Sequence, residues 1–396
     1  MRAIALKEFL ELRRDRRTVA MLFLLPFLFL VVFGYAASFD VDEIPTVVVG
    51  PSAKLVRARL PEQFKVVDTR PGDDASAAEE ALSRGEAVVA FVTPASSGGD
   101  AVVLVDGSEL FAAQAALRRI AMAQAAAGAL RQSSGTGGQD AAPSGVAGVL
   151  PEQAQQALAV IGEAESKVLF NPDLRTAVVM VPGLCGIILV FVGTIATALG
   201  VVRERQAGTM EQLAVMPFRP RDVFLGKIAP YLAIAAVDMA VIVAVGMLIF
   251  DVPFRGSVAT FALGSALFLF VTLGVGVLIS TVSQTQGQAI QLAILFMVPQ
   301  FLLSGLFFPL YAMPWAVRWI GYCLPLTWFV KIARGVMVRG APIDALWLPF
   351  VVLAVMATVV FTLSVLRFRK DLAPAGPEGE DGATAAGTAE EAGAAA

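Results

Sequence analysis

The chain has 396 residues, of which 57% are hydrophobic, with a mean hydropathy of +0.73 and a formal net charge of −3. The apolar residues form long blocks, which excludes a single soluble domain and predicts several membrane-spanning helices. The sequence contains no histidine, which excludes imidazole acid–base catalysis, and its two cysteines lack the spacing of a metal site. We therefore expect no catalytic residues, no metal and no cofactor.

The charged residues indicate an orientation. The segment between Asp40 and Asp173 holds 10 basic and 18 acidic residues, whereas other basic residues gather in short stretches beside the apolar blocks. Basic flanks of this kind mark the cytoplasmic side of a membrane. Because these residues flank apolar blocks and form no continuous stripe, we expect no nucleic-acid partner.

The N-terminal part combines three kinds of sequence. Residues 1–17 place apolar and charged residues on opposite helical faces, which predicts a cytoplasmic interfacial helix. Residues 18–38 are apolar and long enough for a first transmembrane helix. Residues 39–172 alternate β-rich runs with helical patterns, which predicts an extracytoplasmic α/β (α+β) domain. The predicted strands are Ile44–Val49, Phe64–Val67, Ala87–Val92 and Ala101–Val105, and the predicted helices are Ala53–Leu60, Ala75–Arg84 and Ser108–Arg131. Residues 151–169 are expected to form a helix that returns toward the membrane.

A transmembrane domain with five further helices is predicted over residues 173–370. The apolar blocks are Thr176–Val202, Ile228–Phe250, Val258–Val282, Ala289–Phe308 and Ala345–Leu366. Each is near the 20 residues or so that a helix needs to cross a hydrocarbon core of about 30 Å. The expected fold class is an all-α polytopic membrane protein with six transmembrane helices, an inserted α/β (α+β) domain and both termini in the cytoplasm.

The stretch 309–340 is apolar, but three prolines interrupt it. A seventh crossing there would move the basic residues after the last span to the outer side, away from an inner leaflet where each is worth about 1 kcal/mol. We therefore predict a re-entrant or interfacial hairpin on the outer side. This arrangement leaves Lys331, Arg334 and Arg339 outside, against the usual charge bias. Residues 371–396 are rich in Ala, Gly and Glu, which predicts a disordered tail.

Several motifs occur in order along the chain. They are KEFLELRRDRRTVAMLFLLPFLFLVVFGYA, RERQAGTMEQLAVMPFRPRDVFLGKIAPY, DVPFRGS, ISTVSQTQGQAIQLA, LLSGLFFPLYAMP and LPLTWFVKIARGVMVRG. Together they resemble the membrane subunits (permeases) of type 2 ABC exporters, in the subgroup with a large external domain between the first two spans. One departure concerns Gln206, which stands where many members of that family carry a second acidic residue.

The resemblance implies a separate ABC ATPase subunit. The chain itself lacks the G-x-x-x-x-G-K-[ST] loop that cradles phosphates, since Arg221 stands where the first glycine belongs and Ile228 follows Lys227. The resemblance also implies a second permease, either another copy or a close relative, because six spans make half a transporter. The external domain suggests a periplasmic adaptor as a further partner.

The charged segment 203–218, between the second and third predicted spans, resembles the cytoplasmic coupling helix of the family. Thr209 and Gln212 match a capping box, and Met210 and Leu213 supply an apolar face for a groove on the ATPase. The alternative is a plain surface loop stabilised by its charges. The predicted coupling residues are Glu204, Arg205, Gly208, Thr209, Met210, Glu211, Leu213 and Pro217.

Asp238 lies in the middle of a predicted span, where a carboxylate is costly unless it faces water or a partner. It either lines a substrate path or makes a buried polar contact between helices. The function expected is ATP-driven export of a hydrophobic or amphiphilic substrate, such as a drug, a lipid or a glycan-like molecule, across a bacterial inner membrane. The alternatives are an ion-coupled secondary transporter or channel, and an envelope anchor for a partner protein.

Overall fold

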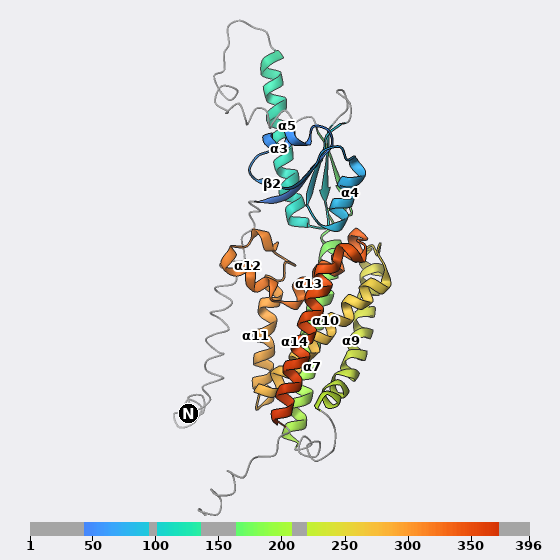
Figure 1. Cartoon of the computed structure of the whole chain (residues 1–396), viewed down its shortest axis with the longest axis vertical. Helices are drawn as coiled ribbons and strands as arrows, with labels where there is room; N and C mark the ends of the chain where they lie inside the picture. Colours follow the sequence, from blue (N-terminus) through green and yellow to red (C-terminus); the bar gives the residue numbers. More distant parts are fainter. Residues whose placement is uncertain (1–42, 95–100, 136–163, 208–219, 372–396) are drawn as a thin grey trace, which may run out of the picture.

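The computed structural model describes residues 43–94, 101–135, 164–207 and 220–371. These residues form an α/β region that sits on one end of a bundle of long helices (Figure 1). The predicted interfacial helix, the first span and the tail beyond Asp371 lie outside the described residues, and so does the chain from 208 to 219.

The α/β region is built on a five-stranded sheet with the strand order β2-β1-β3-β4-β5. Strand β1 (Ile44–Val49) lies parallel to both β2 (Phe64–Arg70) and β3 (Val89–Val92). Strand β4 (Val102–Asp106) runs antiparallel to β3 and parallel to β5 (Glu165–Leu169). The α/β character predicted for this part of the chain is confirmed.

Helices cover both faces of the sheet because successive side chains along a strand point to opposite sides. Val48 of β1 packs with α3 (Ala53–Arg59) and α5 (Leu110–Gly135) in one core. Val47, its neighbour, packs with α4 (Ala75–Arg84) in a second core on the other face. Both valines are fully buried, so each face of the sheet is a hydrophobic interface with helices.

Strand β5 corrects the end of the return helix predicted over 151–169, because residues 165–169 form an edge strand along β4, while residues 151–163 lie outside the described residues. Hydrogen bonds offered by the neighbouring strand outweigh a weak local helical pattern. The chain then enters the bundle at Asn171, which is 3% exposed. Its side-chain amide donates to the backbone oxygens of Gly107 (3.2 Å) and Arg175 (3.1 Å), which ties the sheet to the first bundle helix.

Among the described residues, five helices are long and apolar enough to cross a membrane. They are α7 (Thr176–Gln206), α9 (Pro220–Phe250), α10 (Val258–Val282), α11 (Gln286–Leu303) and α14 (Trp347–Asp371). Each matches one of the five later spans predicted from the sequence. Helix α11 stops at Leu303 and not at Phe308, because Gly305 takes a left-handed conformation (φ 83°) that ends the helical path.

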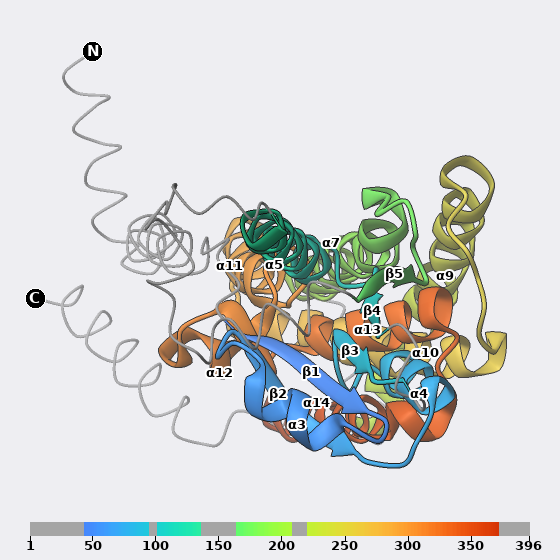
Figure 2. The same cartoon turned by 90° about the horizontal axis from the view of Figure 1, so that it is seen from above.

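Helix α7 is central in the bundle and packs against α9, α10, α11 and α13 (Pro325–Arg334). Figure 2 shows α9 and α11 at opposite edges of the bundle. A close approach joins α7 to α10, where a Cβ atom at Gly276 would lie 2.8 Å from the backbone oxygen of Thr194. Small residues permit this kind of contact between membrane helices.

We expect Gly276→Leu to lower the free energy of unfolding by about 1–3 kcal/mol, because the added side chain meets backbone atoms of α7 that have no room to move. Thermal unfolding of the purified chain in detergent measures the change. Gly226→Leu is the matched control, since no atom lies within 4 Å of a Cβ built there. Equal unfolding midpoints for the two variants would show that α7 and α10 do not approach this closely.

Between α11 and α14 the chain forms short elements. The 3-10 turn η1 (Leu310–Ala312) leads to α12 (Trp315–Tyr322), and α13 continues as the π-helix η2 (Gly335–Arg339). A second 3-10 turn, η3 (Ile343–Leu346), opens α14. Neither α12, with 8 residues, nor α13, with 10, reaches the length of about 20 residues that a crossing requires.

Candidate functional site

The end of α7 that lies away from the sheet is hydrogen-bonded to the turn between α10 and α11. We call these hydrogen bonds of Arg205 and Gln206 the clasp. Arg205 donates through Nη1 to the backbone oxygens of Ser280 (3.1 Å) and Ser283 (3.0 Å). Gln206 accepts a hydrogen bond from Nε2 of Gln286 at 2.9 Å through its own Oε1. Three helix ends are therefore fixed to one another where α7 leaves the bundle.

The turn that receives Arg205 is itself well defined. Ser283 Oγ donates to the backbone oxygen of Ile279 at 2.7 Å, and Thr285 caps α11 by accepting from the backbone nitrogen of Gln288 at 3.3 Å. Capping groups satisfy backbone donors that a helix start leaves open. The end of α7 is therefore bound to a turn whose own backbone is held by side-chain hydrogen bonds.

Two of the predicted coupling residues, Glu204 and Arg205, lie in the last turn of α7. Gly208, Thr209, Met210, Glu211, Leu213 and Pro217 lie outside the described residues. Nothing in the local sequence indicated that Arg205 would bind the α10–α11 turn, because Ser280 and Ser283 lie 75 and 78 residues beyond it along the chain. The side-chain amides of Gln206 and Gln286 form a neutral hydrogen bond there.

Basic residues lie at the same end of the bundle as this clasp. Arg203 and Arg205 end α7, Arg221 lies in the first turn of α9, and Arg367 lies near the end of α14. Helix α7 has 31 residues, so this end lies about 46 Å along the helix from its start beside the sheet. The α/β region and this basic end therefore occupy opposite ends of the bundle (Figure 1).

Asp238 is half-buried on α9. Its carboxylate makes no hydrogen bond or ion pair with the rest of the described chain. The groove between α9 and α10, a cavity of ≈ 610 Å³, is lined by other residues, among them Met239, Val243 and Phe261. The structure therefore does not bring Asp238 into this cavity, and its predicted role in a substrate path stays a prediction.

Sequence reasoning missed a set of polar contacts at the sheet end of the bundle. Arg334, which is 4% exposed, donates to the backbone oxygens of Leu306 (2.9 Å), Val179 (3.3 Å) and Gly305 (3.5 Å). Its Nη1 atom also lies 3.6 Å from Oε2 of Glu109, at the start of α5. One guanidinium therefore joins α7, the chain after α11 and the α/β region.

Arg339 makes a second buried contact with the α/β region. Its Nη1 atom lies 3.4 Å from Oδ2 of Asp106, a fully buried carboxylate. Burial raises the pKa of Asp106 above its usual range, and the charge of Arg339 opposes this shift. The guanidinium also faces Gly85, where a Cβ atom would lie 2.7 Å from Nη1.

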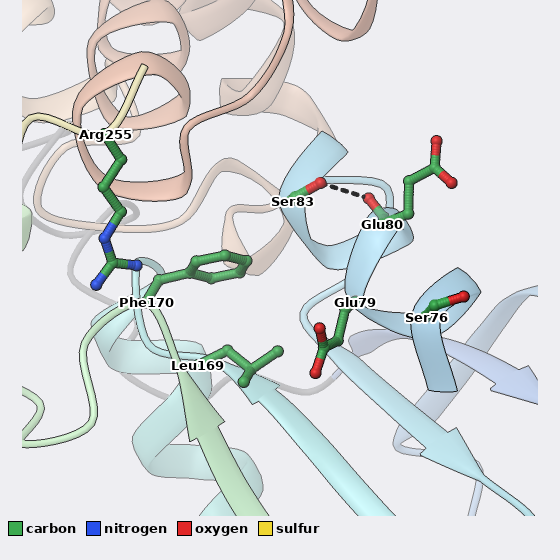
Figure 3. A pocket seen from close by; sticks show the side chains of 7 residues that line it. All are labelled: Ser76, Glu79, Glu80, Ser83, Leu169, Phe170 and Arg255. Carbon is green, nitrogen blue, oxygen red and sulfur yellow. Dashed lines mark hydrogen bonds between the residues drawn. The ribbon is translucent and has the colours of Figure 1, made fainter. Parts of the chain in front are cut away.

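An open pocket of ≈ 460 Å³ lies beside these contacts, between α4 and the loop that joins α9 to α10. Figure 3 shows Glu79 of α4 pointing toward Leu169, and the guanidinium of Arg255 lying next to Phe170. Glu80 points away from the pocket. The pocket presents the carboxylate of Glu79 on one side, the guanidinium of Arg255 on the other and the apolar residues Leu169 and Phe170 between them.

The fold defines a polytopic membrane protein with an α/β region at one end, and a family comparison gives its class. The family model described as "ABC-2 family transporter protein" matches residues 16–366. The chain therefore belongs to the ABC-2 family of transporter proteins, and the resemblance to type 2 ABC permeases is confirmed.

The bacterial relatives carry permease names. The chain is 34% identical over 211 residues to the inner membrane transport permease YhhJ of Escherichia coli (strain K12), covering 52% of this chain and 56% of the relative. It is 31% identical over 201 residues to the probable multidrug ABC transporter permease YbhR of the same organism, covering 51% and 55%. ABC transporter G family member 20 of Dictyostelium discoideum is 26% identical over 197 residues, covering 49% and 27%. The chain spans about half the length of the bacterial relatives.

Proposed function

We propose that this chain is the membrane-spanning subunit of an ATP-driven exporter whose ATPase is a separate subunit. The observation that carries the proposal is the clasp of Arg205 at the end of α7, directly before the segment that resembles a coupling helix. A partner that moves the segment after Gln206 would pull α7, α10 and α11 together. The names of the related permeases support an ABC ATPase as that partner.

The substrate that we propose is a hydrophobic or amphiphilic molecule, such as a drug, a lipid or a glycan-like compound. The apolar groove between α9 and α10 supports this class, because methionine, valine and phenylalanine side chains line it. The relative YbhR is named a probable multidrug permease, which agrees with a substrate of this kind. Asp238 also lies on α9 but does not line this groove, and it remains the proposed polar residue of the substrate path.

We propose a bacterial inner membrane as the location, because the relative YhhJ is named an inner membrane permease. The basic end of the bundle would face the cytoplasm, with both termini and the coupling residues on that side. The α/β region would then lie outside the cytoplasm, as the domain 39–172. The transmembrane domain would comprise residues 18–38 and 173–370, with 309–340 as the outer hairpin.

A second permease completes the proposed transporter, because the family resemblance implies that six spans make half of a transporter. Either another copy of this chain or a close relative would provide the second half, with the two subunits related by a two-fold axis. A periplasmic adaptor that binds the α/β region is a further proposed partner.

Reconstitution tests the proposal. The chain is placed in vesicles alone, and together with a candidate ABC ATPase subunit, and the outward movement of an amphiphilic fluorescent dye is measured. We expect no ATP hydrolysis by the chain alone, and ATP-dependent dye movement only when both subunits are present. Dye movement that an ion gradient drives through the isolated chain would replace this proposal with a secondary transporter.

A further inference from the structure

A cavity of ≈ 120 Å³ lies where the start of α5, the end of α11, η1 and α13 meet. Its polar lining residues are Glu109, Ser304, Tyr311, Tyr322, Thr327, Lys331 and Arg334. The space equals that of about four liquid water molecules at about 30 Å³ each. It therefore has room for a small polar group.

Two buried hydroxyl groups in this lining lack a hydrogen-bond partner within the described parts of the chain. They are Oγ of Ser304, a residue that is 2% exposed, and Oη of Tyr311, whose ring packs against the core of the α/β region. Buried hydroxyls in native proteins are nearly always hydrogen-bonded. Two unpaired donors that line one cavity indicate that an acceptor occupies it.

Lys331 supplies the charge that such an acceptor needs. Its Nζ atom lies 4.6 Å from the ring centre of Trp328 and 5.5 Å from that of Tyr322. No carboxylate of the described residues lies within 4.0 Å of it. Arg334, in contrast, is already engaged by three backbone oxygens and by Glu109. With one carboxylate and two cations, the lining carries a net positive charge.

The mouth of the cavity lies beside a surface suited to a membrane interface. Trp315, Trp319 and Tyr322 are 78%, 53% and 41% exposed. They are spaced by four and three residues on α12, so they share one face of this helix. Tryptophan and tyrosine concentrate at the level of lipid head groups. Tyr322 belongs both to this aromatic face and to the cavity lining.

We propose that this cavity binds a phosphoryl group, held by Lys331 and by the hydroxyls of Ser304 and Tyr311. A phosphoryl group offers several acceptor oxygens for the two unpaired hydroxyls and a negative charge that balances the positive charge of the lining. The group comes either from a phospholipid head group at the aromatic face of α12 or from free phosphate. This proposal does not depend on the identity of the transported substrate. Binding of a lipid head group requires that α12 lies at the membrane surface, whereas binding of free phosphate does not.

The test uses the purified full chain and two probes. Native mass spectrometry in detergent measures retention of phosphatidylglycerol, with diacylglycerol as the phosphate-free comparison. Equilibrium dialysis with radiolabelled inorganic phosphate measures the free anion. The variants are Lys331→Gln, Tyr311→Phe and the rescue variant Lys331→Arg. Lys167→Gln, at an exposed position of β5, is the matched control.

Lys331→Gln is expected to weaken binding of the phosphoryl probe about tenfold, since it removes a charge-assisted hydrogen bond. Tyr311→Phe should weaken it less, while Lys331→Arg and Lys167→Gln should retain it. Lysine-dependent retention of phosphatidylglycerol identifies a lipid head group, and lysine-dependent binding of phosphate alone identifies the free anion. If neither probe responds to Lys331→Gln while the variant unfolds at the same temperature as the unaltered chain, the cavity is a water site and the proposal is overturned.

Discussion

Replacing Arg334 with methionine is expected to lower the free energy of unfolding by about 3–5 kcal/mol, the range found when one member of a buried ion pair is removed. Arg334 is 4% exposed, and its guanidinium donates hydrogen bonds to the backbone oxygens of Val179, Gly305 and Leu306. Methionine fills much of the same space but donates no hydrogen bond. These acceptors and the carboxylate of Glu109 then lose a partner that water replaces only in part.

Denaturant unfolding of the purified chain measures this change, and Arg175→Met is the matched control. Arg175 also pairs with a carboxylate, Asp251 at 3.5 Å, and donates to a backbone oxygen. Its side chain is 46% exposed, however, so its loss is expected to cost less than about 1 kcal/mol. The double variant Arg334→Met with Glu109→Gln should be no less stable than Arg334→Met alone. Similar losses for Arg334→Met and Arg175→Met would contradict the contacts described for Arg334.

The long helices could be predicted from the sequence because each depends on a local property, a run of apolar residues long enough to cross a bilayer. Helix α10 has the predicted bounds, Val258–Val282. The β-rich run Ile44–Val49 likewise predicted a strand, and the structure buries side chains on both of its faces. Helix α11 ended earlier than expected because the backbone conformation of Gly305 is not encoded by apolarity.

The contacts between the α/β region and the bundle could not be predicted in this way. Arg339 and Asp106 are 233 residues apart, and the local sequence around either residue does not predict a contact with the other. One signal was present, because Lys331, Arg334 and Arg339 contradict the charge bias expected of an outer segment. Two of these three cations face buried or partly buried carboxylates of the α/β region. Basic residues that contradict the charge bias of a predicted outer segment are therefore candidates for ion pairs with distant carboxylates.

The double variant Met210→Asp with Leu213→Asp is expected to abolish co-purification of the ATPase subunit. Both residues lie on the apolar face predicted for the coupling segment after Gln206, and burying two carboxylates in an apolar groove costs several kcal/mol. Affinity purification of the co-expressed subunits measures the loss. Because Met210 and Leu213 are predicted to face the partner, the thermal midpoint of the chain itself should change little.

The variant Arg205→Gln distinguishes binding of the ATPase subunit from transfer of its movement to α10 and α11. It removes the hydrogen bonds to Ser280 and Ser283 but leaves the apolar face of the coupling segment unaltered. The ATPase should therefore still co-purify and hydrolyse ATP, while the transport of substrate for each ATP falls. ATPase retained by the Met210→Asp, Leu213→Asp chain would mean that the subunit binds elsewhere. Unchanged transport by Arg205→Gln would mean instead that the movement reaches α10 and α11 without the clasp.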